Sequence, residues 1–79
     1  MSSSPILIDV RTPAEYAEGH YPQALNHEVG LMMEGVYPQV SHDTPLQVYC
    51  RSGGRSALAK QLLQQAGYTQ VEDLGAYRP

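Results

Sequence analysis

Short apolar segments alternate along the chain with segments that favour helices, and this alternation limits the fold more than any other feature. The β-branched run at residues 6–10, ILIDV, is typical of a buried strand in a parallel sheet. Residues 46–49 and 71–74 predict two further strands, and residues 23–26 predict a brief fourth one. Because helical segments separate these strands, the sequence predicts an α/β domain with a small, mainly parallel sheet flanked by helices.

Two weaker helical segments lie in the first half of the chain. Thr12 is a good N-cap, Pro13 suits the first helical position, and Glu15 completes a capping box. The short helix that follows should end at Gly19. Residues 28–36 also predict a helix, although two glycines weaken it.

The strongest helical pattern follows the only cysteine. Residues 55–66 form helix readily, and Gly67 suits the position just past a helix end. The apolar positions expected to face the sheet are Leu58, Leu62 and Ala66, flanked by Ala59 and Leu63.

The size and charge of the chain limit its class. Its 79 residues suffice for one domain, so we expect a flexible tail at residues 1–5 and a single domain at residues 6–79, as a monomer or a weak dimer. A net charge of −3 argues against nucleic acid as a partner, and no apolar run approaches the ~20 residues of a membrane span. We expect a cytoplasmic location, or a periplasmic one if a signal peptide has been removed.

Cys50 ends a predicted strand and opens a polar loop that runs into the strongest helix. Ligands of open α/β sheets bind beyond the carboxyl ends of strands, which is where this loop lies. The helix N-terminus offers unpartnered amides and the positive end of a dipole, and glycines let the chain curl so that amides point inward. The expected anion-binding residues are Arg51, Ser52, Gly53, Gly54, Arg55 and Ser56.

The first anion that such a loop would stabilise is the thiolate of Cys50 itself. Neighbouring positive charges and a helix N-terminus lower the pKa of a cysteine, so we expect a nucleophile that is ionised near neutral pH. The alternative is an inert buried thiol, but such a residue has no need of two arginines beside it.

The length of the loop indicates the substrate. Four residues separate Cys50 from Arg55. Cysteine phosphatases use a loop one residue longer, and one residue spans up to ~3.5 Å of chain. The shorter loop suits one added sulfur atom better than a tetrahedral phosphate, so a small phosphatase or arsenate reductase is the least favoured alternative.

Three segments resemble rhodanese-like domains. CRSGGRS at residues 50–56 closely resembles the active-site loop of that family. Residues 7–26, LIDVRTPAEYAEGHYPQALN, resemble the opening of such a domain, and residues 62–77, LLQQAGYTQVEDLGAY, resemble the part after its active-site helix. With a match that covers residues 6–77, the chain is identified as a member of the rhodanese-like family.

The resemblance implies an enzyme of the thiosulfate sulfurtransferase type, with no metal or organic cofactor. Cys50 would take sulfane sulfur as a persulfide from a small anionic donor such as thiosulfate, and pass it to cyanide, a thiol or another protein. The loop amides would hold the terminal sulfur, Arg51 and Arg55 would bind the donor, and Ser52 and Ser56 would tune the loop. The alternative is a sulfur-relay module, a persulfide carrier that acts with a protein partner.

Three positions depart from the family pattern. Gln23 stands where the family often has glycine, so the turn before Asn26 should differ. Ala76 replaces a frequent second glycine. The sequence ends at Pro79, where many relatives continue into a helix, and this predicts a more open pocket.

Several other residues have structural interpretations. We expect Asp9 and Arg11 to be structural, with Arg11 joining the first strand to a neighbouring loop. The histidines lack metal-ligand spacing, so no metal site is expected. Met32 and Met33 are expected in the core or a pocket wall, and Glu15 on a solvated face.

Overall fold

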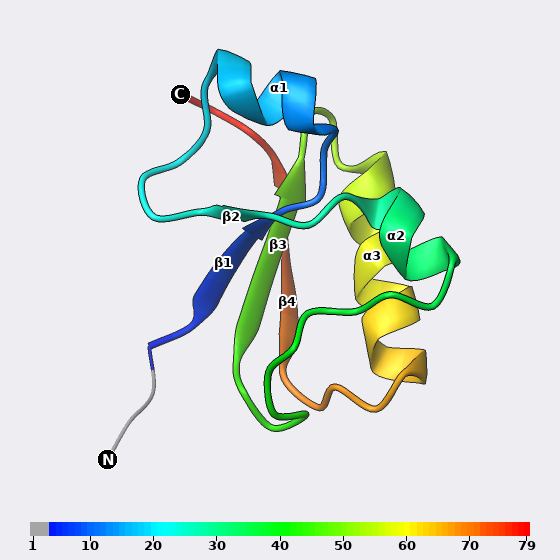
Figure 1. Ribbon diagram of the computed structural model, residues 1–79. Coiled ribbons are helices and arrows are strands. Elements are labelled where there is room, and N and C mark those ends of the chain that lie inside the picture. Colours follow the sequence, from blue (N-terminus) through cyan, green and yellow to red (C-terminus); the bar gives the residue numbers. More distant parts are fainter. Residues whose placement is uncertain (1–3) are drawn as a thin grey trace.

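The structure, a computed structural model that describes residues 4–79, is built on a four-stranded sheet (Figure 1). Its strands are β1 (Ile6–Asp9), β2 (Leu25–Asn26), β3 (Leu46–Cys50) and β4 (Val71–Ala76), in the order β2-β1-β3-β4. All three pairings are parallel, so the predicted α/β class is confirmed.

Three helices connect the strands: α1 (Pro13–Glu18), α2 (Val29–Met33) and α3 (Gly54–Gln65). Figure 1 shows α2 and α3 on one face of the sheet and α1 at the end where the strands finish. Because β3 leads directly into α3, the loop after Cys50 lies at this same end, close to α1.

The core fills the space between the sheet and the two helices on its face. Burial of each large apolar side chain stabilises the fold by about 1.5–3 kcal/mol. Alternate strand residues point into this layer, and the two helices close it. Its largest fully buried apolar members are Ile8, Val10, Met32, Leu46, Val48 and Leu63.

The buried side of α3 differs from the predicted one. Ser56, Ala59 and Leu63 are fully buried, whereas Leu58 is 37% exposed. Ser56 faces inward because it contacts the sulfur of Cys50, and residues three and seven positions later then share its side of the helix. The prediction was therefore wrong for Leu58, since the contacts of the first turn set the rotation of the helix.

α2 is shorter than predicted, ending at Met33. Gly35 follows with a φ of +87°, which helical backbone does not adopt. Met32 is buried, but Met33 is 65% exposed because adjacent helical residues lie about 100° apart around the axis. The prediction that both methionines are internal was wrong for Met33.

β4 runs two residues beyond its predicted end, to Ala76. The ladder shifts register beside Val48 and Tyr49, so that Tyr49 pairs with Gly75. Gly75 has a φ of +79°, and its backbone lies against Gly53 of the cysteine loop. The irregular part of β4 therefore packs against the cysteine loop.

The predicted N-terminal tail lies largely outside the described residues. Of residues 1–5, only Ser4 and Pro5 are described, and both are exposed. Within residues 4–79, no helix has the length and apolarity needed to cross a bilayer.

Candidate active site

The sulfur of Cys50 lies inside a turn of backbone amides. The amide of Gly53 donates to Sγ at 3.0 Å, and the amide of Ser56 donates at 3.3 Å. The thiol also contacts Oγ of Ser56 at 3.6 Å, and that hydroxyl donates to the Gly53 carbonyl at 3.1 Å. The loop and the first turn of α3 thus each direct one backbone amide at this sulfur.

The Cys50 side chain is fully buried, yet its polar contacts outweigh burial. Burial raises the pKa of the thiol, whereas the Ser56 side chain and the amides of Ser56, Gly53 and Ser52 lower it. The result is a pKa below the ordinary value for cysteine. We expected the arginines to share in this shift, but the main stabilising contacts come from the loop amides and Ser56. The inert-thiol alternative predicts burial correctly, but it does not predict the two backbone amides that donate to the sulfur.

The backbone of Cys50 is anchored by the segment after β4. The amide of Tyr77 donates to the Cys50 carbonyl at 2.7 Å. The Tyr77 ring packs against Tyr49 and against Tyr21. The aromatic contacts and the Tyr77 hydrogen bond thus tie the end of β3, where Cys50 lies, to the segment after β4.

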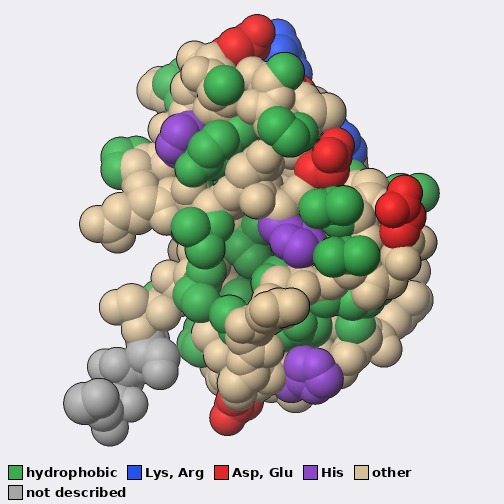
Figure 2. All heavy atoms as spheres, in the orientation of Figure 1, with side chains coloured by type: hydrophobic (Ala, Val, Ile, Leu, Met, Phe, Trp, Pro, Cys, Tyr) green, Lys and Arg blue, Asp and Glu red, His purple; other side chains and the backbone are tan. Residues whose placement is uncertain are grey.

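The two loop arginines have different surroundings. Arg51 is exposed, and within the described residues its guanidinium has no ion-pair partner. In Figure 2, the visible Lys and Arg side chains gather at the end of the molecule that carries α1. Arg51 borders a surface cavity of about 390 Å³ whose other lining residues are Arg11, Glu18, Gly19 and Tyr77.

Arg55 instead pairs with Glu15 of α1. Its two terminal nitrogens donate to the two carboxylate oxygens at 2.6 and 3.0 Å. This contact lowers the pKa of Glu15 to about 2, and burial opposes the shift only in part. The expectation that Glu15 lies on a solvated face was wrong, because its side chain is only 21% exposed and its carboxylate binds Arg55.

Glu15 also completes the predicted capping box. Its Oε1 accepts hydrogen bonds from the amide and the hydroxyl of Thr12, both at 3.1 Å. The Thr12 hydroxyl in turn accepts from the Glu15 amide. The capping prediction is confirmed, and one carboxylate serves both α1 and Arg55.

Glu15 was not predicted as a residue of the site. The signal present in the sequence is an acid in the first turn of one predicted helix and a cation in the first turn of another. In the structure β1 and β3 are neighbours, so the helices that follow them begin at the same end of the sheet. An acid in the first turn of one helix then lies close to a cation in the first turn of the other.

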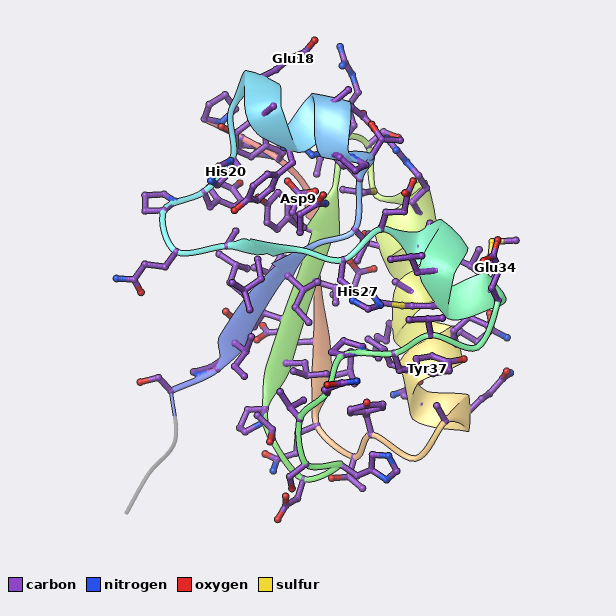
Figure 3. The ribbon with its side chains drawn as sticks, in the orientation of Figure 1. Asp9, Glu18, His20, His27, Glu34 and Tyr37 are labelled. Atoms are coloured by element: carbon purple, nitrogen blue, oxygen red, sulfur yellow. The ribbon has the colours of Figure 1, made fainter. Side chains whose placement is uncertain are left out.

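Asp9 and Arg11 form a buried ion pair under α1, with Asp9 labelled in Figure 3. Arg11 donates to Asp9 at 2.7 Å and to the Gly19 carbonyl at 2.7 Å, and its guanidinium lies 4.6 Å from the Tyr77 ring centre. Arg11 therefore joins the end of β1 to the turn after α1, which confirms the structural interpretation.

The two histidines labelled in Figure 3, His20 and His27, contact residues that are close to them in the sequence. His20 stacks on Tyr16 at 3.6 Å, and its Nδ1 lies 2.7 Å from the Tyr16 carbonyl. His27 Nε2 lies 2.9 Å from the Val36 carbonyl. Both contacts are explained by the local fold.

Gln23 adopts a left-handed backbone, with a φ of +68°. Among the described residues it is the one non-glycine residue with a positive φ. The glycine that the family often has at this position would adopt such a turn without strain. Gln23 therefore carries backbone strain at this turn.

The fold and the site define a small parallel α/β domain whose cysteine sulfur accepts hydrogen bonds from backbone amides of the loop and helix that follow it. The chain belongs to the family of rhodanese-like domains, whose model matches residues 1–75. The structure is similar to a solved rhodanese with anions from Escherichia coli, with a TM-score of 0.82 and 34% identity over 92% of this chain and 87% of that one.

Two named proteins are similar in sequence. A sulfurtransferase of Allochromatium vinosum is 40% identical over 72 residues, which cover 87% of this chain and 64% of that protein. The thiosulfate sulfurtransferase PspE of Escherichia coli is 37% identical over 73 residues, covering 90% of this chain and 69% of PspE. The chain thus spans less than two thirds of the Allochromatium relative.

Proposed function

We propose that this domain is a sulfurtransferase that carries sulfane sulfur as a persulfide on Cys50, with thiosulfate or a similar anion as donor. One observation carries the proposal: the amide of Gly53 in the short Cys-to-Arg loop and the amide of Ser56 in the first turn of α3 converge on the sulfur. The names of the two sequence relatives support the same chemistry.

In the first step, the Cys50 thiolate attacks the outer sulfur of thiosulfate. A bond forms between the two sulfurs, the sulfur–sulfur bond of thiosulfate breaks, and sulfite leaves with the electron pair. Charge balances, because a thiolate and a thiosulfate become a persulfide anion and a sulfite. Covalent catalysis of this kind divides one transfer into two easier steps.

The loop stabilises the anion at each stage. Preformed donors stabilise developing charge without reorganisation, and the amides of Gly53 and Ser56 are already directed at the sulfur. Arg51 and Arg55 add positive charge for the donor, and Ser52 and Ser56 adjust the loop. A guanidinium has more N–H groups than Glu15 occupies, so Arg55 retains donors for a substrate.

In the second step, a nucleophilic acceptor attacks the outer sulfur of the persulfide. With cyanide, a carbon–sulfur bond forms, the persulfide bond breaks, and thiocyanate leaves the Cys50 thiolate behind. A thiol acceptor, on a small molecule or a protein, would leave as a persulfide in the same way.

Intact mass spectrometry tests the proposal directly. After incubation with thiosulfate, the protein should gain one sulfur atom, and a reducing agent should remove it. Cys50→Ala should gain none. A wild-type protein that stays unmodified by thiosulfate and by other sulfane donors would refute the proposal.

A second candidate is a sulfur-relay module that receives its sulfur from a partner protein. Because Cys50 is completely buried, any donor reaches the sulfur only if the loop opens, and a partner protein that binds the loop could supply that opening. Rapid turnover of free thiosulfate would support the enzyme. Persulfide that forms only with a cysteine desulfurase present would support the relay module.

A further inference from the structure

Glu15 places a negative charge at a site that is otherwise built for anions. The charged groups around the cysteine loop are Arg51 and Arg55 from the loop and α3, Glu15 from α1, and the Arg11–Asp9 pair from the end of β1. A carboxylate at this place weakens the positive field on Coulombic grounds alone. Any favourable effect of Glu15 on an anion at Cys50 must therefore come from the contacts that its carboxylate makes, not from its charge.

The geometry is a chain of contacts from α1 to Cys50, in which hydrogen bonds run as far as the Arg55 side chain and the backbone then leads to the Ser56 amide. Thr12 holds the Glu15 carboxylate through its amide and its hydroxyl. The carboxylate holds Arg55 through both terminal nitrogens, which sets the orientation of the guanidinium as well as its distance. Arg55 lies in the first turn of α3, next to Ser56, whose amide donates to the Cys50 sulfur.

Among the hydrogen bonds of residues 4–79, those between Glu15 and Arg55 are the ones that join α1 to the first turn of α3. Glu15 and Arg55 are 40 positions apart in the sequence. α1 and the first turn of α3 lie at the end of the sheet where β3 finishes (Figure 1). The pair thus holds the helix turn that carries the loop amides against a second element.

We propose that Glu15 is a positioning residue that holds Arg55, and with it the amides of the first turn of α3, in the orientation that stabilises an anion on Cys50. The expected effect of Glu15 on catalysis rests on the proposed function. Its expected effect on the stability of the Cys50 thiolate does not. The proposal gives the two arginines different roles. Arg55 fixes the position of the loop in addition to any contact with the donor, whereas Arg51 contributes a positive charge that no carboxylate of the described residues neutralises.

A positioning role and a simple charge effect of Glu15 predict opposite changes in the pKa of Cys50 when Glu15 is replaced by glutamine. If Glu15 acted only as a charge, Glu15→Gln would lower the pKa of Cys50 and speed the reaction with an anionic donor, because Arg55 would no longer be neutralised. If Glu15 positions the loop, Glu15→Gln raises the thiol pKa and slows the reaction, because the amides lose their orientation. Glutamine can still complete a capping box, so α1 should persist.

The experiment measures the rate of alkylation of Cys50 by iodoacetamide, a neutral reagent, as a function of pH. We expect Glu15→Gln to move the inflection to higher pH and to lower kcat/KM with thiosulfate about tenfold, chiefly through kcat. Glu15→Asp keeps the charge but shortens the side chain, and should shift the inflection in the same direction. Glu18→Gln, which removes a charge from the same helix without breaking the Arg55 contact, should not raise it.

A lower or unchanged inflection in Glu15→Gln would overturn the proposal, as would wild-type behaviour of Glu15→Asp. If Glu15→Gln does not fold, Glu15→Asp and Arg55→Lys, which keep both charges but lose the paired contact, decide the matter. Alkylation requires no sulfur transfer. A wild type that forms no persulfide would therefore refute the proposed function and leave the positioning test intact.

Discussion

The amide nitrogen of Gly53 lies 3.0 Å from the sulfur of Cys50, three residues earlier in the chain. The turn reaches this geometry because Gly53 has a φ of +103°, a conformation that residues with a Cβ rarely adopt. The nearest atom to an added Cβ would be Cα of Gly75, 3.9 Å away, which is ordinary contact. Backbone conformation rather than space therefore requires glycine here.

Gly53→Ala should turn this amide away from the sulfur and raise the thiol pKa. Loss of one hydrogen bond to an anion corresponds to a rate of alkylation about tenfold lower at pH 6.5. Gly54→Ala is the matched control, because Gly54 is helical with open space around its Cα. That variant should be slightly more stable and should not slow alkylation. Equal effects of the two substitutions would contradict the role given to the Gly53 amide.

The sequence predicted the strands and the loop because their signals are local. The apolar runs of β1 and β3 and the Thr12 capping box each depend on adjacent residues. The pairing of Glu15 with Arg55 does not, because it depends on which strands are neighbours and on the orientation of two helices. The order of the strands, which the sequence pattern does not give, decides whether the first turns of the two helices meet.

The rotation of α3 was missed for a related reason. An apolar stripe containing Leu58 fits the sequence as well as the observed one does. The contact between Ser56 and the buried sulfur decides between them, and a polar residue facing the core is not expected from hydrophobic periodicity. A functional contact therefore overrode the hydrophobic pattern.

Gln23→Gly should stabilise the domain. A residue with a Cβ in the left-handed region costs roughly 1–2 kcal/mol, and glycine removes that cost while adding freedom to the unfolded chain. We expect a net gain of about 0.5–1 kcal/mol, measured by urea denaturation. Gln39→Gly, at an exposed loop position without a positive φ, should lower stability slightly. A loss of stability in both variants would show that the Gln23 turn is not strained.

Arg51→Ala should weaken donor binding without affecting the fold. The side chain is exposed, and within residues 4–79 it has no ion-pair partner, so little stability depends on it. We expect KM for thiosulfate to rise about tenfold with a smaller change in kcat, as one charge-assisted contact is lost. Lys60→Ala removes a cation from α3 beyond the loop and should change KM much less. Equal KM values in Arg51→Ala and the wild type would remove Arg51 from the donor site.

The Glu15–Arg55 pair should appear in the acid stability of the domain. The pKa of Glu15 is about 2 in the folded protein, below its ordinary value of 4.5, chiefly because of the hydrogen bond from Arg55. A carboxylate with a lowered folded pKa stabilises the fold above the unfolded pKa, and this contribution is lost as the pH falls from about 5 towards 2. Because Arg55 is 37% exposed, solvent screening reduces the contribution to about 1 kcal/mol.

Urea denaturation between pH 7 and pH 2.5 measures that contribution. The wild type should lose more stability over this range than Glu15→Gln, whose side chain does not titrate, and the two curves should approach each other at the acid end. Glu18→Gln should keep the wild-type slope, since within the described residues Glu18 has no ion-pair partner. Parallel curves for the wild type and Glu15→Gln would mean that the Arg55 contact contributes nothing to the stability of the fold in solution.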